Sequence, residues 1–423
     1  MDLGRPIGKS PHPVSVHERI DLIDVVRGFA LFGVLLANLV WITTDVVLTD
    51  ARLSQLPTAP LDRIVKPLVV FFVDHKFYTL FSFLFGLGFA IQLSRGEESR
   101  YNVVAVYGRR VSILAVIGLL HIAFIWYGDI LLVYAIGGFG LLAVRRWNTR
   151  LLLTLALALA LFARAAVGVS PPIAGAPDSP HVDAESKENA EKERNLAIFD
   201  GTSYRDIARE NAAFYYRDIV ARGVGLFLLP QVFARFIFGL YVGRRNWARR
   251  TTQLRPALRR LLPWAIGVGV IGNGTAMLIE QLQDTSVLGR DSFWVHAGAP
   301  VEEVGILALA FAYLSVLVLL FHRSASWRRW LGYLAPVGRM ALTNYLTQSV
   351  LYFALFTGVG FGLYGDVGPA WCVGLALIIF AAQMTFSRWW LARYRFGPAE
   401  WVWRTLTYGQ LQPMREPVSA RTT

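Results

Sequence analysis

The chain has 423 residues, of which 55% are hydrophobic and only 17% charged, and its formal net charge at pH 7 is +13. Soluble domains carry about a quarter charged residues, so this composition argues against a soluble protein. The positive charge does not indicate nucleic-acid binding either, because the arginines form short runs between apolar blocks and no compact basic patch. The single cysteine, Cys372, excludes an intrachain disulfide.

Long apolar blocks recur along the chain, and many are long enough to cross a hydrocarbon core of about 30 Å as helices. Backbone polar groups in lipid must be hydrogen-bonded within their own segment, so the blocks predict an all-α, polytopic membrane protein. The first block is too long for the core of a signal peptide, and we expect it to be retained. We expect about ten transmembrane helices, near residues 20–42, 67–93, 110–127, 130–145, 151–168, 223–243, 261–281, 300–321, 338–358 and 369–387.

The arginines between the blocks predict the orientation of these helices. If the amino terminus lies in the cytoplasm and the helices alternate, the arginine-rich connections 94–109, 145–150, 244–260 and 322–337 and the tail after 387 are all cytoplasmic. The connections on the other side are poorer in basic residues, as the positive-inside rule requires. Both termini are therefore expected in the cytoplasm.

A long polar segment separates two halves of five predicted helices each. We divide the chain into a cytoplasmic tail (1–19), an N-terminal half (20–168), an extracytoplasmic loop (169–222), a C-terminal half (223–387) and a cytoplasmic interfacial helix with its tail (388–423). Within the loop, turn residues and mixed charge over 170–195 indicate a partly flexible excursion. The pattern of 200–223 predicts an amphipathic surface helix. The stretch FGPAEWVWRTLTYG (396–409) is too short to span, and its Trp and Tyr residues favour the interface.

Two histidines fall inside predicted spans, and each has a carboxylate near it in the sequence. His75 follows Asp74 in the outer part of its span, whereas His121 is expected near the middle of its span. An ionisable side chain within a span normally faces the bundle interior, which makes His121 a candidate site residue. A neutral imidazole hydrogen-bonded between helices explains it equally well. Asp129, in the short turn that follows, suits a cap on the next helix.

Other polar side chains inside the spans are mostly expected to hydrogen-bond one helix to another; they are Asn38, Ser82, Gln231, Asn273, Glu302, Glu303, Asn344 and Gln348. Arg235 is the costly exception, because a guanidinium at this depth needs an anion or a cavity. Arg27 and Arg339 begin their spans on the cytoplasmic side, where a long side chain can reach the interface.

The sequence contains none of the nucleophile-elbow, phosphate-loop or HExxH signatures. The pairs Asp74/His75 and His121/Asp129 lack the spacing of metal ligands, so we expect no metal site. The glycine-rich GVGVIGNG (267–274) lies in a predicted span with no strand before it, which favours close helix packing over dinucleotide binding.

Five stretches together resemble the YeiB-like bacterial membrane proteins, whose carboxy-terminal half is known as domain of unknown function 418. They are RGFALFGVLLANL (27–39), KFYTLFSFLFGLGFA (76–90), GLLHIAFIWYGDILLVYAIGG (118–138), PVGRMALTNYLTQS (336–349) and GPAEWVWRTLTYG (397–409). They occur in the family's order and cover essentially the whole chain. The resemblance implies a multi-pass protein of the bacterial inner membrane.

The family is grouped with transmembrane acyltransferases, which resemble one another in moving an acyl group from a cytoplasmic thioester to an extracytoplasmic acceptor, often a sugar. The resemblance therefore implies acyl-coenzyme A as donor substrate, with no tightly bound cofactor. Relatives use a membrane-embedded histidine, which His121 matches within its motif; His75 lies where the reactive histidine of the heparan-modifying enzymes is expected. As a base, His121 would activate the acceptor; as a carrier, it would hold the acyl group itself.

The same resemblance implies roles for other residues. Asp129 would orient the ring of His121 if the fold brings it back, which its spacing of eight residues leaves open. Donor phosphates suit the guanidinium groups of Arg27, Arg339 and Arg235. Asn38 and Asn344 would line the passage.

Two other functions stay open on the sequence alone. Intramembrane Arg and His residues also suit a transporter for a small anionic solute, although the two halves lack symmetric broken helices. A non-catalytic envelope scaffold would use 170–222 as its contact surface. Membrane lipids are expected partners in every case, and a homo-oligomer stays open.

Overall fold

The computed structural model describes residues 21–99, 102–169, 181–285, 287–289 and 292–415, and all regular secondary structure within these ranges is helical. The longer helices are α1 (Asp21–Thr44), α3 (Ala59–Phe72), α4 (Lys76–Ser99), α5 (Val103–Phe124), α6 (Leu131–Val144), α7 (Thr149–Val169), α8 (His181–Phe199), α9 (Tyr204–Tyr215), α10 (Val224–Arg244), α11 (Thr251–Asp284), α12 (Phe293–Phe321), α15 (Ala341–Phe356), α16 (Pro369–Leu391) and α17 (Pro398–Tyr408). Shorter elements are α2 (Asp50–Gln55), α13 (Ala325–Gly332), α14 (Ala335–Arg339), a π-helix (Tyr216–Ala221) and a 3-10 turn (Trp247–Arg249). The predicted all-α fold class is confirmed.

Seven helical segments in the described residues are long and apolar enough to cross a membrane, namely α1, the stretch of α3 and α4, α5, α10, α11, α12 and α16. Their outward faces are apolar, with Trp264, Ile271 and Ile378 each about 70% exposed. Apolar surface of this extent belongs in hydrocarbon and not in water. The chain is therefore a multi-pass helical membrane protein. The other predicted spans also coincide with helices, but α6 and α15 are shorter, so the count of ten stays a prediction.

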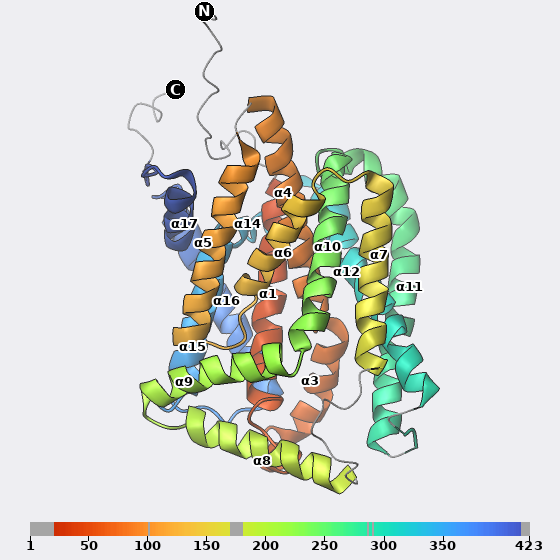
Figure 1. The fold of residues 1–423 in the computed structure, drawn as a ribbon, viewed down its shortest axis with the longest axis vertical. Coiled ribbons are helices and arrows are strands. Elements are labelled where there is room, and N and C mark those ends of the chain that lie inside the picture. Colours follow the sequence, from red (N-terminus) through yellow and green to blue (C-terminus); the bar gives the residue numbers. More distant parts are fainter. Residues whose placement is uncertain (1–20, 100–101, 170–180, 286, 290–291, 416–423) are drawn as a thin grey trace, which may run out of the picture.

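The long helices run side by side, and their connections separate into two kinds of end (Figure 1). The connections α4–α5, α6–α7 and α10–α11 and the helix α17 gather at one end, which is the arginine-rich end expected from the sequence. Two of these connections touch, because Arg244 donates hydrogen bonds to the carbonyl groups of Trp147 and Arg145. Helices α8 and α9 lie across the opposite end. The side of the membrane on which each end lies stays a prediction.

The structure corrects the predicted span 67–93, which is broken at 73–75. Helix α3 ends at Phe72 and α4 begins at Lys76. His75 adopts a left-handed backbone with φ 61°, a conformation that non-glycine residues rarely take. The carboxylate of Asp74 accepts a hydrogen bond from the amide of His75 at 3.0 Å, and the ammonium group of Lys76 donates to the carbonyl of Val70 at 2.9 Å. These polar groups satisfy the backbone at a break that lies within apolar sequence.

Glycines let α4 and α10 pack in direct backbone contact. A Cβ atom on Gly86 would collide with the backbone carbonyl of Phe236, and one on Gly239 would collide with that of Phe83. The rings of Phe85 and Phe236 stack beside this contact, 4.5 Å apart between centroids. The glycine-rich stretch 267–274 serves the same purpose, because Gly272 faces Gly305 of α12. Helices in lipid gain little from the hydrophobic effect when they associate. Small residues at such contacts stabilise the association instead, because they allow close van der Waals packing.

Gly86→Ala is expected to destabilise the protein by about 1–3 kcal/mol, the usual cost of overpacking. The added methyl group has to displace backbone and not a flexible side chain. Gly88→Ala is the matched control, since nothing lies within 4 Å of a Cβ atom there. Thermal unfolding of the two purified variants should show a lower midpoint for Gly86→Ala alone. Equal midpoints would contradict the packing.

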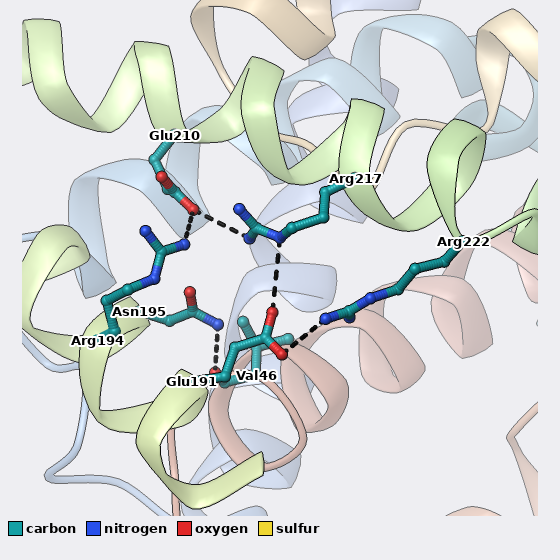
Figure 2. A network of polar contacts seen from close by, with 7 residues as sticks. All are labelled: Val46, Glu191, Arg194, Asn195, Glu210, Arg217 and Arg222. Atoms are coloured by element: carbon teal, nitrogen blue, oxygen red, sulfur yellow. Dashed lines mark hydrogen bonds and ion pairs between the residues drawn. The ribbon is translucent and has the colours of Figure 1, made fainter. Parts of the chain in front are cut away.

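The segment after residue 180 is an ordered helical hairpin. Helix α9 and the π-helix that continues it lie beside α8 and are joined to it by ion pairs (Figure 2). Glu210 pairs with Arg194 at 2.6 Å and with Arg217 at 3.1 Å. Glu191 pairs with Arg217 at 3.6 Å and with Arg222 at 2.8 Å. The amphipathic helix predicted over 200–223 is present. Of the flexible excursion predicted over 170–195, residues 181–195 instead belong to α8, and residues 170–180 lie outside the described ranges.

The hairpin is also attached to the helical bundle. The amide of Asn195 donates to the carbonyl of Val46 at 3.2 Å, which joins α8 to the segment after α1 (Figure 2). Phe199 at the end of α8 accepts a backbone hydrogen bond at 2.9 Å from Gly358, in the α15–α16 connection. Gly223, with φ 71°, then turns the chain from the π-helix into α10. The hairpin therefore forms a cap over one end of the bundle.

Candidate functional site

His121 lies in the last turn of α5, at the capped end of the bundle. The amides of Ile125 and Trp126 both donate to the carbonyl of His121 at 2.9 Å, which ends the helix. The expectation that His121 lies near the middle of its span is therefore wrong. The polar turn Tyr127–Asp129 stays outside the helix and sets the end of α5 only three residues beyond the histidine.

Asp129 caps the next helix, as expected, and it also lies beside His121. One carboxylate oxygen, Oδ1, accepts a hydrogen bond from the amide of Leu132 at 2.8 Å and so caps α6. The other oxygen, Oδ2, lies 2.9 Å from Nδ1 of His121. Gly118 makes this approach possible, because a Cβ atom there would come within 3.0 Å of Asp129 and closer still to the Leu132 amide. The spacing of glycine, histidine and aspartate in this motif thus follows from one tight helical hairpin.

The imidazole of His121 is enclosed on all sides. Its side chain is 1% exposed and that of Asp129 is fully buried. The two atoms of the pair are close, although their angle falls short of good hydrogen-bond geometry, and Nε2 has no hydrogen-bond partner among the described residues. Such a buried nitrogen carries a free-energy cost. The aromatic rings of Tyr345 and Trp126 lie 5.5 and 6.3 Å from the imidazole centroid.

This arrangement has the form of an oriented base. A carboxylate on Nδ1 fixes the ring and favours the tautomer whose Nε2 carries a lone pair. That lone pair can take a proton or attack a carbonyl carbon. The sequence did not identify Tyr345 and Trp126 as neighbours of His121, because one comes from α15 and the other from the irregular turn after α5.

Asn38 lies in the same region and is connected to His121 through the side chains of Tyr352 and Trp126. Its side chain hydrogen-bonds to Tyr352, whose hydroxyl also donates to the carbonyl of Leu35 at 3.3 Å. The ring of Tyr352 meets that of Trp126 edge to face, with centroids 5.5 Å apart. The predicted role of Asn38 in lining a passage stays a prediction.

Helix α9 closes the region from outside. The hydroxyl of Tyr204 donates to the carbonyl of Phe124 at 2.9 Å, and the amide of Asn211 donates to that of Ile125 at 3.3 Å. These bonds satisfy carbonyl groups that the end of α5 leaves free. Burial raises the pKa of Tyr215 to about 12, and the negative charge of Asp129 adds to the rise, so this phenol stays protonated near the pair.

A small cavity remains between α9 and the turn after α5. Its lining includes Trp126, Tyr127, Asn211, Tyr352 and Thr357. The cavity has room for about one water molecule. Because the side chain of His121 is only 1% exposed, a substrate larger than water does not reach it in this conformation.

Among the described residues, His75 and His121 share no contact. His75 lies at the break between α3 and α4, with 40% of its side chain exposed, and the expectation that it lies within a continuous span is wrong. Its Nε2 atom is 3.6 Å from Asp74, and its ring meets that of Tyr78 edge to face at 5.6 Å. In the part of the chain that the structure describes, no three His, Cys, Asp or Glu side chains converge as metal ligands.

The anion that pairs with Arg235 is the carboxylate of Glu303, inside the protein. Its guanidinium lies 2.8 Å from Glu303 of α12 and also donates to the hydroxyl of Thr79 at 2.7 Å. Both members of the pair are at most 1% exposed. The ring of Tyr78 lies below the guanidinium at 5.0 Å, and its hydroxyl donates to Gln231. Arg235 is thus engaged by an internal carboxylate, and this arrangement gives no support to its expected contact with donor phosphates.

Asn344 belongs to a ladder of polar side chains between α15 and α16. Its side-chain amide donates to the hydroxyl of Ser387 at 3.0 Å, and its backbone carbonyl accepts from the side chain of Gln383 at 2.9 Å. Gln383 in turn accepts from Gln348 at 2.9 Å. This is the helix-to-helix hydrogen bonding expected of such residues. Nothing in these contacts places Asn344 beside a passage.

Arg27 contacts the backbone of the residue that precedes Arg339, at the arginine-rich end. The guanidinium of Arg27 donates to Asp24 at 2.7 Å and to the carbonyl of Gly338, next to Arg339, at 3.4 Å. Gly28 and Gly338 allow α1 and α14 to approach, since a Cβ atom on either would collide with the backbone of the other element.

Two of the motifs singled out in the sequence meet in space at this same end. Glu400 of α17 accepts hydrogen bonds from the amides of Leu342 and Thr343, at 2.6 and 3.1 Å, and so caps α15. The hydroxyl of Thr343 donates to Glu400 at 2.5 Å and accepts from the amide of Ala399 at 3.0 Å. A Cβ atom on Gly397 would collide with this carboxylate. The helix predicted within 396–409 is present as α17, and these bonds hold it against the bundle.

Glu400→Ala is expected to destabilise the protein by about 2 kcal/mol, because it leaves buried amides of α15 without acceptors. The fall in the thermal unfolding midpoint measures this effect. Glu400→Gln is the control and keeps one acceptor oxygen, so its midpoint should fall less. A larger fall for Gln than for Ala would contradict the assignment of the cap.

Glu400 also predicts a pH dependence. Burial raises the pKa of its carboxyl group, although the hydrogen bonds from Thr343 and Leu342 act in the opposite direction. A carboxyl group whose pKa is raised by folding stabilises the protein fully below the unfolded pKa, and this contribution is lost as the pH rises through the folded pKa. Unfolding midpoints recorded against pH should show this loss in the wild type and not in Glu400→Gln.

Comparison with known proteins identifies the family to which this chain belongs. The family model described as "Protein of unknown function (DUF418)" matches residues 242–410. The uncharacterized protein YxaH of Bacillus subtilis (strain 168) is 31% identical over 96% of this chain and 98% of its own length. An uncharacterized 39.9 kDa protein from the amylase 3' region of Bacillus acidopullulyticus is 29% identical over 95% and 97% of the two chains.

A third relative, the uncharacterized protein YeiB of Escherichia coli (strain K12), is 26% identical over 92% of this chain and 96% of its own. The family model includes the stretches that meet at Glu400, and the full-length relatives extend the likeness over nearly the whole chain, which includes the region of His121. The chain belongs to the YeiB-like DUF418 family of membrane proteins.

Proposed function

We propose that the protein is a membrane-bound acyltransferase that moves an acyl group from acyl-coenzyme A, at the arginine-rich end, to an acceptor at the end capped by α8 and α9. The observation that carries the proposal is the pair of His121 and Asp129. A buried imidazole with a carboxylate 2.9 Å from one nitrogen, and with the other nitrogen unpartnered among the described residues, is suited to nucleophilic or base catalysis.

As a base, His121 takes a proton from an acceptor hydroxyl at Nε2. The hydroxyl oxygen then attacks the thioester carbonyl, a carbon–oxygen bond forms, and the carbon–sulfur bond breaks. The imidazolium returns its proton to the departing thiolate of coenzyme A. Asp129 holds the ring and stabilises the imidazolium while it carries the proton. As a carrier, Nε2 would attack the thioester carbonyl, so that a carbon–nitrogen bond forms while the carbon–sulfur bond breaks and coenzyme A leaves as its thiolate. The acceptor hydroxyl would then attack the acyl-imidazole, a carbon–oxygen bond would form as the carbon–nitrogen bond breaks, and the hydroxyl proton would pass to the thiolate.

The positions of the two candidate regions fit a donor that enters from the arginine-rich end. Arg27 and Arg339 would hold its phosphates. Asn38 lies eleven residues further along α1 than Arg27, which is about 16 Å of helix. The thioester at the end of the flexible pantetheine arm would therefore have to pass inward along α1 to reach the region of Tyr352 and His121. The site is closed in this conformation, so catalysis also requires an opening movement.

Transport of a small anionic solute is the second candidate, and two observations favour it. The ion pair of Arg235 and Glu303 is buried among the spans, where ionisable groups often mark a pathway for ions or substrates. The helix broken at 73–75 lies beside the same region, because Thr79 and Tyr78 contact Arg235. Broken helices form substrate sites in many transporters.

Thermal unfolding of the purified protein with acetyl-coenzyme A tests the donor site. A ligand that binds only the folded state raises the midpoint in a concentration-dependent manner. We expect a rise in the wild type and in His121→Ala, and its loss in Arg339→Ala. Arg323→Ala is the matched control, since Arg323 is exposed at the same end and should leave the rise intact. No rise at millimolar ligand would contradict the proposal and favour transport, to be tested by solute uptake into proteoliposomes.

A further inference from the structure

A second group of cations lies at the arginine-rich end, where the start of α11 meets the end of α12 and the start of α13. The hydroxyl of Thr251, the first residue of α11, is 2.9 Å from Nε2 of His322, which follows α12. The guanidinium of Arg328 on α13 lies over the ring of Phe321 at 5.3 Å. Apolar side chains from the same three helices, including Leu258 and Leu331, pack beneath them.

Positive charge in this cluster meets no carboxylate in the part of the chain that the structure describes. Burial lowers the pKa of His322, and the positive charges of Arg255 and Arg328 lower it further, which places both guanidinium groups within electrostatic reach of the ring. Among the described residues, no carboxylate forms an ion pair with either arginine. The Nε atom of Arg255 is buried and has no hydrogen-bond partner in the part of the chain described. Within the described ranges, the cluster therefore has room for an external anion.

The surroundings of the cluster suit the headgroup layer of a membrane. Trp327 and Trp330 on α13 are 40% and 70% exposed, and Trp264 on α11 is 72% exposed. Tryptophan concentrates at the level where headgroups meet hydrocarbon. Beyond the cluster, α11 continues into apolar sequence with Leu261 exposed as well. An anion bound by the arginines would thus have apolar surface beside it.

We propose that Arg255, Arg328 and Thr251 bind the phosphate of an anionic phospholipid headgroup. The two guanidinium groups supply charge and paired N–H donors, to which phosphate oxygens are complementary. The hydroxyl of Thr251 fixes the neutral ring of His322 beside them. The exposed tryptophans and Leu261 receive the acyl chains, and this apolar flank is what favours a lipid over free inorganic phosphate. The site uses none of the residues assigned to the donor and does not depend on the acyltransferase proposal.

The test is lipid binding to the full-length protein in detergent, read as the rise in thermal unfolding midpoint. Phosphatidylglycerol and phosphatidylcholine with identical acyl chains are compared, and inorganic phosphate forms a third arm. The test variant is Arg255→Gln with Arg328→Gln. The matched control is Arg259→Gln with Arg329→Gln, which removes the same charge from exposed positions on the same two helices.

Phosphatidylglycerol should raise the midpoint of the wild type and of the control, and phosphatidylcholine should not. At about 1 kcal/mol per arginine, the test variant should bind phosphatidylglycerol roughly 30-fold more weakly. Arg328→Gln alone should give about half of that effect on a logarithmic scale. Because this side chain is exposed, the single variant still tests the site if the double variant does not fold. Equal weakening in the control, or equal binding of the two lipids, would overturn the site. A rise with inorganic phosphate equal to that with phosphatidylglycerol would overturn the assignment to lipid.

Discussion

Replacing His121 by glutamine is expected to lower the rate of acyl transfer by about 10²–10⁴-fold, the usual contribution of a positioned acid–base group, or to abolish transfer if the imidazole carries the acyl group. Glutamine retains a polar group that can face Asp129, so the fold should be retained. The rate of label transfer from acyl-coenzyme A in a single turnover measures the effect. His296→Gln, at the start of α12, controls for the loss of a histidine elsewhere.

Asp129→Asn separates the two functions of this carboxylate. The amide oxygen can still accept from Leu132 and cap α6, so the unfolding midpoint should change little. An asparagine has no charge to stabilise the imidazolium and can favour the wrong tautomer, so the rate should fall by a comparable factor. Wild-type rates in folded His121→Gln protein would remove His121 from the mechanism.

Removing one member of the pair formed by Arg235 and Glu303 is expected to destabilise the protein by about 3–5 kcal/mol, because the partner is left as an uncompensated buried charge. Arg235→Met is the sharper case, since Glu303 is 0% exposed and has no other cation as an ion-pair partner in the described residues. Thermal unfolding midpoints measure the loss.

The double variant Arg235→Met with Glu303→Met tests whether the pair acts as a unit. Neither charge remains to be buried, so its midpoint should return close to that of the wild type, as buried pairs replaced by apolar residues often do. A double variant as unstable as the sum of the two single variants would contradict direct coupling. Retained acyl transfer in the folded double variant would show that the pair is structural, whereas lost solute uptake would favour the transport alternative.

Much of the fold can be predicted from the sequence because long apolar stretches indicate membrane-spanning helices. The arginines between the blocks identify one end of the bundle, and the structure gathers their connections there. The break at 73–75 could not be predicted in this way, because the apolar pattern continues on both sides of it. The signal was the polar run of Asp74, His75 and Lys76, which supplies the hydrogen bonds of the break.

The candidate site was only partly predictable. The sequence identifies His121 and Asp129, but their contact depends on how closely α5 and α6 approach across the turn. Gly118 permits that approach, because a side chain there would collide with Leu132 and Asp129. The pairing of Arg235 with Glu303 joins residues 68 positions apart. The cap of α15 by Glu400 joins residues 57 and 58 positions apart. A single sequence carries no information on which distant polar residues meet.

The most direct test of the central claim is transfer across a sealed membrane. The protein is reconstituted in vesicles, labelled acetyl-coenzyme A is supplied only to the arginine-rich face, and a panel of simple sugars and amino sugars only to the face capped by α8 and α9. We predict labelled acyl-sugar on the capped side, none when the donor is moved to that side, and none with His121→Gln. Product that forms equally from either side, or equally in His121→Gln, would contradict the account.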